Sequence, residues 1–158
     1  MRTYEPAAVA FALDRNPEDI RNWRRLSYIA DIGQAHGRAN VYTFEEACLL
    51  RTGAYIGHYL KTFENGFAFA RERRALIENA ARDALLDPED FTRDSVLTIT
   101  LDDRTSNGFS GVISAPIASI CFDPDEPPPA GLLQVNISEI ARRVAYGLKA
   151  YVRSQKAA

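Results

Sequence analysis

The spacing of the apolar residues changes at Ser95, and this change constrains the fold more than any other feature of the sequence. Before it, apolar residues recur mainly every three or four positions, the period of an amphipathic helix. From Ser95 onward, Leu97, Ile99 and Leu101 alternate with threonines, which is typical of a half-buried strand. The helical period returns near the C-terminus. This order of helices, strands and a final helix predicts an α+β protein.

The same order divides the chain into two expected units, residues 1–62 and residues 63–158. A chain of 158 residues has room for one compact domain or for two small units in series. The second unit is expected to begin with a linking helix over Phe67–Leu86, which Asp87-Pro88 ends. A small antiparallel sheet covered by a C-terminal helix should follow, and we interpret this unit as a dimerisation or regulatory domain.

Particular elements of the second unit can be predicted from turn residues and periodicity. Further strands are expected at Phe109–Ser114, Ile117–Phe122 and Leu132–Ile137, with a turn at Asp102–Gly108 and an exposed acidic loop at Asp123–Pro129. The last helix is expected to begin at Ser138-Glu139, to bury Ile140, Val144, Leu148 and Val152, and to fray over Ser154–Ala158.

The first unit begins with a short helix after Pro6, and a second helix starts at Asn16-Pro17-Glu18-Asp19. That tetrapeptide combines an N-cap residue, proline at the first helical position and two acids near the positive end of the helix dipole. Ile20 and Trp23 lie three residues apart and should pack the second helix onto the first. A hairpin is expected within Leu26–Tyr42, followed by a helix that Thr43 and Glu46 cap, running through about Arg51 to a possible end at Gly53.

The charge is unremarkable in total but uneven along the chain. There are 19 basic and 21 acidic residues, for a net charge of −2. Between Arg15 and Arg38, however, five arginines accompany only three acids. A local surplus of this kind matters more than net charge for contacting phosphates, although a solvated helix face would carry similar residues.

The first 60 or so residues resemble the winged helix-turn-helix of the MerR family. The matching residues are Tyr4, Val9-Ala10, Asn16-Pro17, Ile20-Arg21-Asn22-Trp23, Gly37-Arg38, Val41-Tyr42-Thr43 and Glu46-Ala47. The resemblance implies a helix, a turn, a recognition helix and a β-hairpin wing that bind double-stranded DNA. Leu26-Ser27 replaces the Gly-Leu that usually follows the recognition helix, and the two cysteines do not match the metal-sensing arrangement.

In such a unit the outer face of the second helix enters the major groove. Arginines there can contact phosphates or guanine edges, Asn22 can pair with adenine, and Arg38 on the hairpin can grip a neighbouring phosphate or the minor groove. The predicted DNA-binding residues are Arg15, Glu18, Arg21, Asn22, Arg24, Arg25, Arg38 and Asn40.

Enzymatic, redox and membrane functions find no support in the sequence. His36 and His58 have no second ligand at a metal-binding spacing, and no nucleophile, phosphate-loop or dinucleotide motif occurs. Cys48 and Cys121 are far apart in the sequence, and we expect both to be buried small hydrophobic residues. Without a signal peptide or a long apolar run, the chain is expected to be cytoplasmic, without cofactor, metal or catalytic role.

The function that these features favour is that of a sequence-specific transcriptional regulator that binds DNA as a homodimer. Two other functions could use the same winged unit: a small terminase subunit of tailed phages, or an architectural protein such as an excisionase. A protein-interaction adaptor that offers its arginines to an acidic partner is a further alternative. The C-terminal unit could serve dimerisation, an effector or a protein partner.

Overall fold

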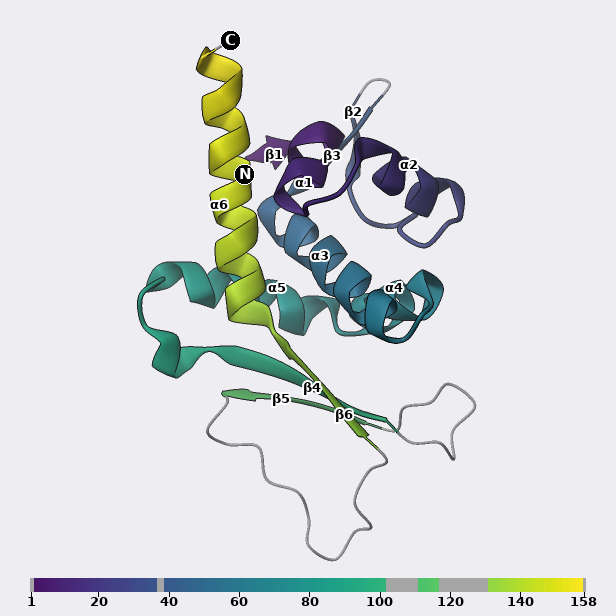
Figure 1. Ribbon diagram of the computed structural model, residues 1–158, viewed down its shortest axis with the longest axis vertical. Coiled ribbons are helices and arrows are strands. Elements are labelled where there is room, and N and C mark those ends of the chain that lie inside the picture. The colour runs from purple at the N-terminus through teal and green to yellow at the C-terminus, as the bar shows by residue number, and fades with distance from the viewer. Residues whose placement is uncertain (1, 37–38, 102–110, 117–130, 158) are drawn as a thin grey trace, which may run out of the picture.

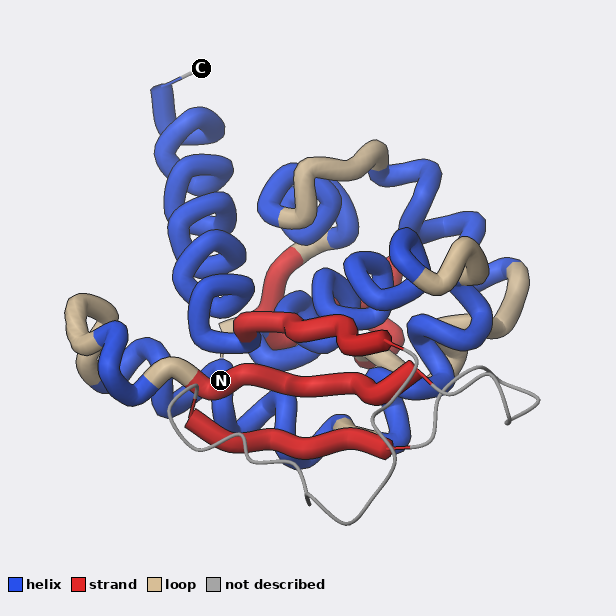
Figure 2. Tube along the Cα trace, turned by 60° about the horizontal axis from the view of Figure 1, so that its bottom comes forward, coloured by secondary structure: helices blue, strands red, loops and turns tan. Residues whose placement is uncertain are grey.

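The computed structural model describes residues 2–36, 39–101, 111–116 and 131–157, and it is an α+β protein (Figure 1). Helices and a small N-terminal sheet lie on one side of a second, three-stranded sheet, as Figures 1 and 2 both show. The helices are α1 (Pro6–Ala12), α2 (Pro17–Arg25), α3 (Phe44–Tyr59), α4 (Phe63–Glu72), α5 (Arg74–Leu86) and α6 (Ile137–Ala157), with a 3-10 turn at Phe91–Arg93. The strands are β1 (Thr3–Tyr4), β2 (Gln34–His36), β3 (Ala39–Thr43), β4 (Ser95–Leu101), β5 (Gly111–Pro116) and β6 (Gly131–Asn136).

The two predicted N-terminal helices and the hairpin are confirmed as elements. Asn16 precedes α2, and the Asp19 carboxylate accepts a hydrogen bond from the Asn16 N–H at 3.1 Å. Strands β2 and β3 pair in antiparallel register, with Ala35 opposite Asn40. The hairpin tip, residues 37 and 38, lies outside the described residues. A two-residue strand that the sequence did not indicate, β1, pairs with β3 and completes a sheet of order β1-β3-β2.

Ile20 and Trp23 are buried, as predicted, with exposed fractions of 2% and 5%. The indole nevertheless packs against rings of α4: its centroid lies 5.7 Å from that of Phe63 and 4.9 Å from that of Phe67. The expectation that Trp23 rests on the first helix is therefore incomplete. Trp23 also packs α2 against α4, a helix that follows it by some 40 residues.

Gly53 does not end α3, which continues to Tyr59. Gly53 and Gly57 instead face α4, where Gly66 sits so close that a Cβ on it would lie 2.4 Å from the Gly53 oxygen and from the Gly57 nitrogen. Such an approach leaves no room for a side chain. Gly53, which was expected to end a helix, instead allows two consecutive helices to pack at short range, together with Gly57 and Gly66.

The predicted linking helix over Phe67–Leu86 is also wrong as a single element. It is divided at Arg73 into the end of α4 and the whole of α5. Helix α4 packs on α3, whereas α5 packs on both α3 and α6, so the chain has to change direction between them. Helical spacing on both sides of Arg73 gave no sign of the bend.

The C-terminal sheet has the order β5-β4-β6 with antiparallel pairing throughout. The strand predicted from Ser95 and the one predicted at Leu132–Ile137 are confirmed within two residues at each end. Of the strand predicted at Phe109–Ser114, residues 111–114 lie in β5, which continues to Pro116. Residues 109 and 110 lie outside the described residues. The predictions for residues 102–108, 117–122 and 123–129 lie outside the described residues.

Strand β4 differs from the predicted half-buried strand, since Leu97, Thr98 and Ile99 are all fully buried. Leu97 and Ile99 join the hydrophobic cluster that the helices share, and Thr98 points to the opposite face. A threonine can pack its methyl group in the interior. The alternation of apolar residues with threonines in β4 therefore did not show that the threonine face of the strand is exposed.

The last helix, α6, begins one residue earlier than predicted and is capped by Asn136. The Asn136 side-chain oxygen accepts the Glu139 N–H at 2.8 Å, while Ser138 accepts the Ser95 N–H at 2.9 Å. Residues 154–157, expected to fray, are helical. Ile140, Val144 and Leu148 are buried as predicted.

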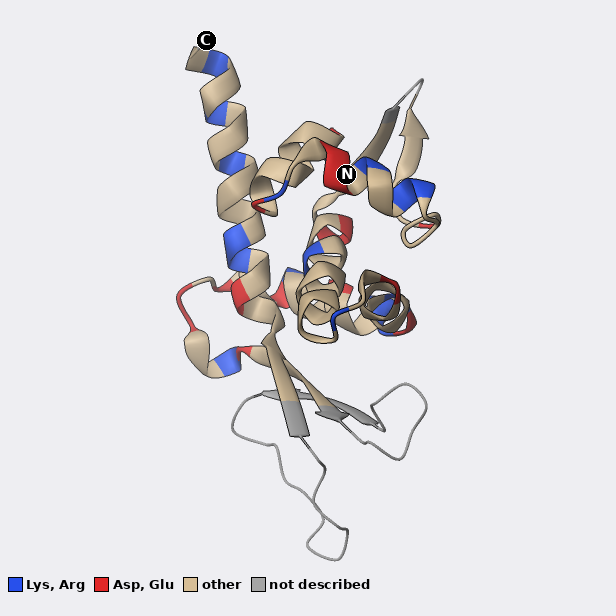
Figure 3. Ribbon diagram, turned by 45° about the vertical axis from the view of Figure 1, so that its right-hand side comes forward, with Lys and Arg blue, Asp and Glu red and all other residues tan. Residues whose placement is uncertain are grey.

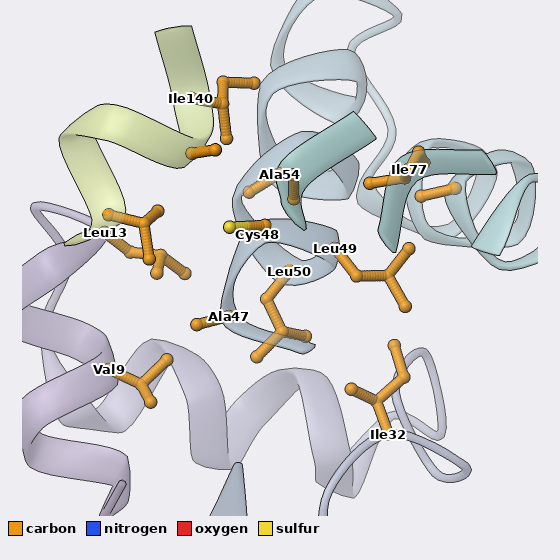
Figure 4. Close-up of a cluster of buried hydrophobic side chains, with 14 of the residues drawn as sticks. Val9, Leu13, Ile32, Ala47, Cys48, Leu49, Leu50, Ala54, Ile77 and Ile140 are labelled. Carbon is orange, nitrogen blue, oxygen red and sulfur yellow. The ribbon is translucent and has the colours of Figure 1, made fainter. Parts of the chain in front are cut away.

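Helix α6 covers other helices more than it covers the sheet. It packs mainly on α1, α3 and α5, and a Cβ on Gly147 would lie 2.7 Å from the Cα of Ala12. One cluster of buried hydrophobic residues consequently extends from Val9 and Leu13 through α3 to Ile77 and Ile140 (Figure 4). Residues from both expected units contribute to it.

A buried ion pair joins the start of β4 to α6. The Asp94 carboxylate, with 6% of its side chain exposed, accepts bonds from Arg142 at 2.6 and 2.9 Å and from the Asn136 amide at 2.9 Å. Burial opposes ionisation of Asp94, but the bonds from Arg142 and Asn136 outweigh it and hold the pKa of that carboxyl below its usual value.

Gly66→Ala should lower the free energy of unfolding by about 1–3 kcal/mol, because the new methyl group would overlap the backbone of α3. Chemical denaturation followed by circular dichroism measures the change. Ala68→Ser, at an exposed position of the same helix, should alter stability by no more than about 0.5 kcal/mol. Equal effects of the two substitutions would mean that α3 and α4 do not pack this closely.

The Asp94 ion pair predicts a loss of stability in acid. Because the folded-state pKa of Asp94 is lowered, the pair stabilises the fold above the unfolded-state pKa of about 3.9 and ceases to do so as the pH falls through the folded-state value. Asp94→Asn should therefore be less stable than the parent at pH 7 and show a smaller decline from about pH 5 to 2. Urea denaturation at several pH values measures both. Asp83→Asn, at an exposed position on α5, should behave like the parent.

Candidate nucleic-acid interface

Helix α2, which carries several of the basic positions coloured in Figure 3, lies beside the β2–β3 hairpin. Of the predicted DNA-binding residues, Arg15, Glu18, Arg21 and Arg25 are exposed, whereas Asn22, Arg24 and Asn40 are half-buried. Arg38 lies outside the described residues.

Arg21 and Glu18 form an ion pair one helical turn apart, with 2.9 Å between the guanidinium nitrogen and the carboxylate oxygen. Their side chains are 71% and 63% exposed. An exposed pair of this kind contributes little to stability, in the range of about 0–1 kcal/mol. Arg21 can therefore exchange Glu18 for a phosphate at small cost.

Arg24 is turned into the protein, unlike its neighbours. Its guanidinium donates to the carbonyl of Ala30 at 3.4 Å, to the carbonyl of Ile32 and to the Tyr42 hydroxyl at 3.4 Å. It also lies over the Tyr42 ring, 5.9 Å from the centroid. Arg24 therefore ties α2 to the loop that follows it and to β3, a structural role that the sequence did not predict.

Arg15 and Arg25 are exposed and form no ion pair or side-chain hydrogen bond with any other residue that the structure describes. Arg25 lies one turn after Arg21 on the same face of α2. Arg15 lies before α2 and lines a cleft at the other end of α1, together with Arg51 of α3. The predicted DNA-binding residues thus lie in two places, with Arg15 at one cleft and the residues of α2 and the hairpin at another surface.

A cleft of about 470 Å³ lies between the N-terminal end of α1, helix α2 and strand β3. Arg21 and Asn40 both line it, so the structure brings a residue of α2 and a residue of the hairpin to one surface. Ile20 and Tyr42 contribute its apolar wall. Spacing in the sequence suggested each of these polar residues separately but not the cleft that they share.

Glu46 fixes the base of the hairpin and was not predicted to do more than cap α3. Its carboxylate accepts the Thr43 N–H at 3.0 Å, as the capping box requires, and also the Gly33 N–H at 3.0 Å. Arg74 of α5 donates to the same carboxylate at 3.1 Å. The sequence near Glu46 gives no sign that its side chain is buried. Its side-chain partner outside α3, Arg74, lies 28 residues further along the chain.

The described residues contain no cluster of three or more histidine, cysteine or acidic side chains that could hold a metal ion. His36 and His58 are exposed, and Cys48 is a buried free thiol whose pKa is raised by burial and, to a lesser degree, by the charge of Glu45. Cys121 lies outside the described residues. None of the described helices combines the length and apolar character needed to cross a membrane.

Comparison with known proteins gives no relative from which a function could be transferred. No model of a protein family matches the chain, and a search of curated proteins finds no significant match.

Arg24 and Arg25 are adjacent, but substituting them should change the free energy of unfolding by different amounts. Arg24→Ala should lower the free energy of unfolding by about 1–3 kcal/mol, because two carbonyls and a hydroxyl lose their donor. Arg25→Ala, at an exposed position, should change it by less than about 0.5 kcal/mol. Urea denaturation of both variants measures the difference, and equal stability would show that the Arg24 contacts contribute nothing.

Proposed function

We propose that this protein binds double-stranded DNA through α2 and the β2–β3 hairpin, as a winged helix-turn-helix protein of the MerR-like kind. The observation that carries the proposal is the division of α2 into two faces. Ile20 and Trp23 anchor one face in the core, and Arg21 and Arg25 stand exposed on the other. A helix held in this way can lie in the major groove, which is about 12 Å wide.

The polar side chains of α2 could serve two purposes: contacts to phosphates that position the protein on DNA, and contacts to bases that recognise the sequence. Arg21 and Arg25 can contact phosphates or the O6 and N7 atoms of guanine, and Asn22 can pair with adenine. Asn40 lines the same cleft as Arg21 and would donate to a phosphate next to the groove. Glu18 competes with DNA for Arg21 and would raise selectivity, because a poorly placed phosphate does not replace it.

The order of elements supports the same assignment. Two helices are followed by an antiparallel hairpin, and β1 adds to β3 so that the hairpin is part of a sheet and not an isolated ribbon. An isolated two-stranded hairpin is at best marginally stable in water. The third strand, the Arg24 contacts and Glu46 would together hold a wing in a fixed position beside the helix.

Within this proposal the protein acts as a homodimeric transcriptional regulator. One copy of α2 offers few cations, and a two-fold pair would double the number of phosphate contacts and read two half-sites. The sheet and α6 would then serve assembly or control. No catalytic step is involved.

The double substitution Arg21→Ala/Arg25→Ala tests the proposal. It should weaken binding to a duplex chosen by selection from genomic fragments by about 10- to 100-fold, and reduce the salt dependence of log K by about two units. Fluorescence anisotropy at several salt concentrations measures both quantities.

The matched control is Arg153→Ala/Lys156→Ala, which removes the same charge from the exposed end of α6. It should bind DNA like the parent, and both double variants should unfold at the parent's temperature. The proposal is overturned if the selection yields no preferred duplex, or if the two double variants lose the same affinity.

A further inference from the structure

A second cleft, of about 280 Å³, lies where the C-terminal end of α1 meets α3. Its lining residues are Leu13, Asp14, Arg15, Arg51, Ala54 and Tyr55. None of them lines the cleft beside α2. Leu13 and Ala54 are part of the buried hydrophobic cluster in Figure 4, so the floor of this cleft belongs to the packed interior.

Arg51 is the unusual residue of this cleft. It is half-buried, yet no carboxylate among the described residues lies within 4 Å of its guanidinium. Its one hydrogen bond to a described residue is a long one, 3.4 Å, to the Ala12 carbonyl. A guanidinium withdrawn from water is ordinarily compensated by an anion, and here the protein supplies none at contact distance.

Neighbouring charges add to the positive character of the cleft. Burial lowers the pKa of Arg51, and the charge of Arg143 on α6 lowers it further. The charge of Asp14 raises this pKa, and that of Arg15 lowers it to a smaller degree. Arginine nevertheless stays protonated in proteins, so the unfavourable charge persists. Asp14 lines the cleft but forms no ion pair with any described residue.

Helix α6 extends the positive surface beyond the cleft. From Ile140 to its end it carries five basic residues and no acidic one: Arg142, Arg143, Lys149, Arg153 and Lys156 (Figure 3). Arg142 is paired with Asp94, and Arg143 with Glu139 at 2.7 Å. The others would draw an anion toward this side of the molecule.

We propose that this cleft binds the phosphate group of a small phosphorylated molecule, held by Arg51 and Arg15. Guanidinium groups bind phosphate through paired N–H donors, and Arg51 and Arg15 together outweigh the single negative charge of Asp14 in the cleft. The Tyr55 hydroxyl, which lies 3.4 Å from that of Tyr59, offers a further polar contact at the rim. The volume suits one phosphate with a small substituent, since pockets for larger ligands span about 300–1,000 Å³.

Isothermal titration of the full-length chain with inorganic phosphate and with pyrophosphate tests this inference. We expect saturable binding of one equivalent, with a dissociation constant in the millimolar range or tighter. Arg51→Gln and Arg15→Gln should each weaken it by about tenfold or more. Lys61→Gln, at an exposed basic position after α3 and outside the cleft, should bind like the parent.

Two further variants keep the test decisive. Arg51→Lys retains the charge but not the paired donors, and should bind more weakly than the parent yet more tightly than Arg51→Gln. If Arg51→Gln fails to fold by circular dichroism, Arg15→Gln carries the test, because Arg15 is exposed. Non-saturable binding, or unchanged binding in Arg15→Gln and Arg51→Lys, overturns the proposal.

The same titration in the presence of saturating duplex DNA separates two sources of phosphate. Undiminished phosphate binding supports a free phosphorylated ligand, whereas its loss would overturn that assignment and give the cleft to the DNA backbone. The proposal does not depend on DNA binding by α2. Failure of the α2 proposal would appear in the anisotropy experiment and leave the phosphate titration without DNA unaffected.

Discussion

The carboxylate of Glu46 accepts hydrogen bonds from three separate parts of the chain. The Thr43 N–H donates to it before α3, the Gly33 N–H donates to it at the start of the hairpin, and Arg74 donates to it from α5. A carboxylate buried to this extent is stable only if its oxygens are satisfied. Each of these three donors therefore depends on the others, and the hairpin cannot move away from α3 without leaving a buried charge poorly paired.

Arg74 carries the connection further. Besides Glu46 it bonds to Glu78 at 2.7 Å on its own helix and to the carbonyl of Asp31 at 3.3 Å. The Asp31 carboxylate in turn pairs with Arg71 of α4 at 2.8 Å. The loop between α2 and the hairpin is thus attached to α4 and α5 by charged side chains, while Trp23 attaches α2 to α4 by ring packing. The candidate surface formed by α2 and the hairpin is therefore held in place by α4 and α5, which are not part of it.

The sequence predicted those features that depend on neighbours within about four residues. Asn16 and Thr43 begin helices as expected, Ile20 and Trp23 are buried, and the alternation after Ser95 marks a strand. The failures concern long-range packing. Gly53 was expected to end a helix, but it lies within α3, where Gly66 of the next helix packs closely against it. The bend at Arg73 and the cover of helices by α6 likewise follow from partners that no local pattern identifies.

The residues of the candidate site that share a helical face could be predicted to the same extent, whereas the internal bonds of Arg24 could not. Residues three and four apart share a face, so Glu18, Arg21 and Arg25 lie together. Arg24 lies one turn after Ile20, on the side that faces the protein, and its long side chain reaches the carbonyls behind the helix. Counting arginines in the segment treated all of them as equivalent, although Arg24 bonds to the carbonyls of Ala30 and Ile32 whereas Arg25 forms no side-chain bond to a described residue.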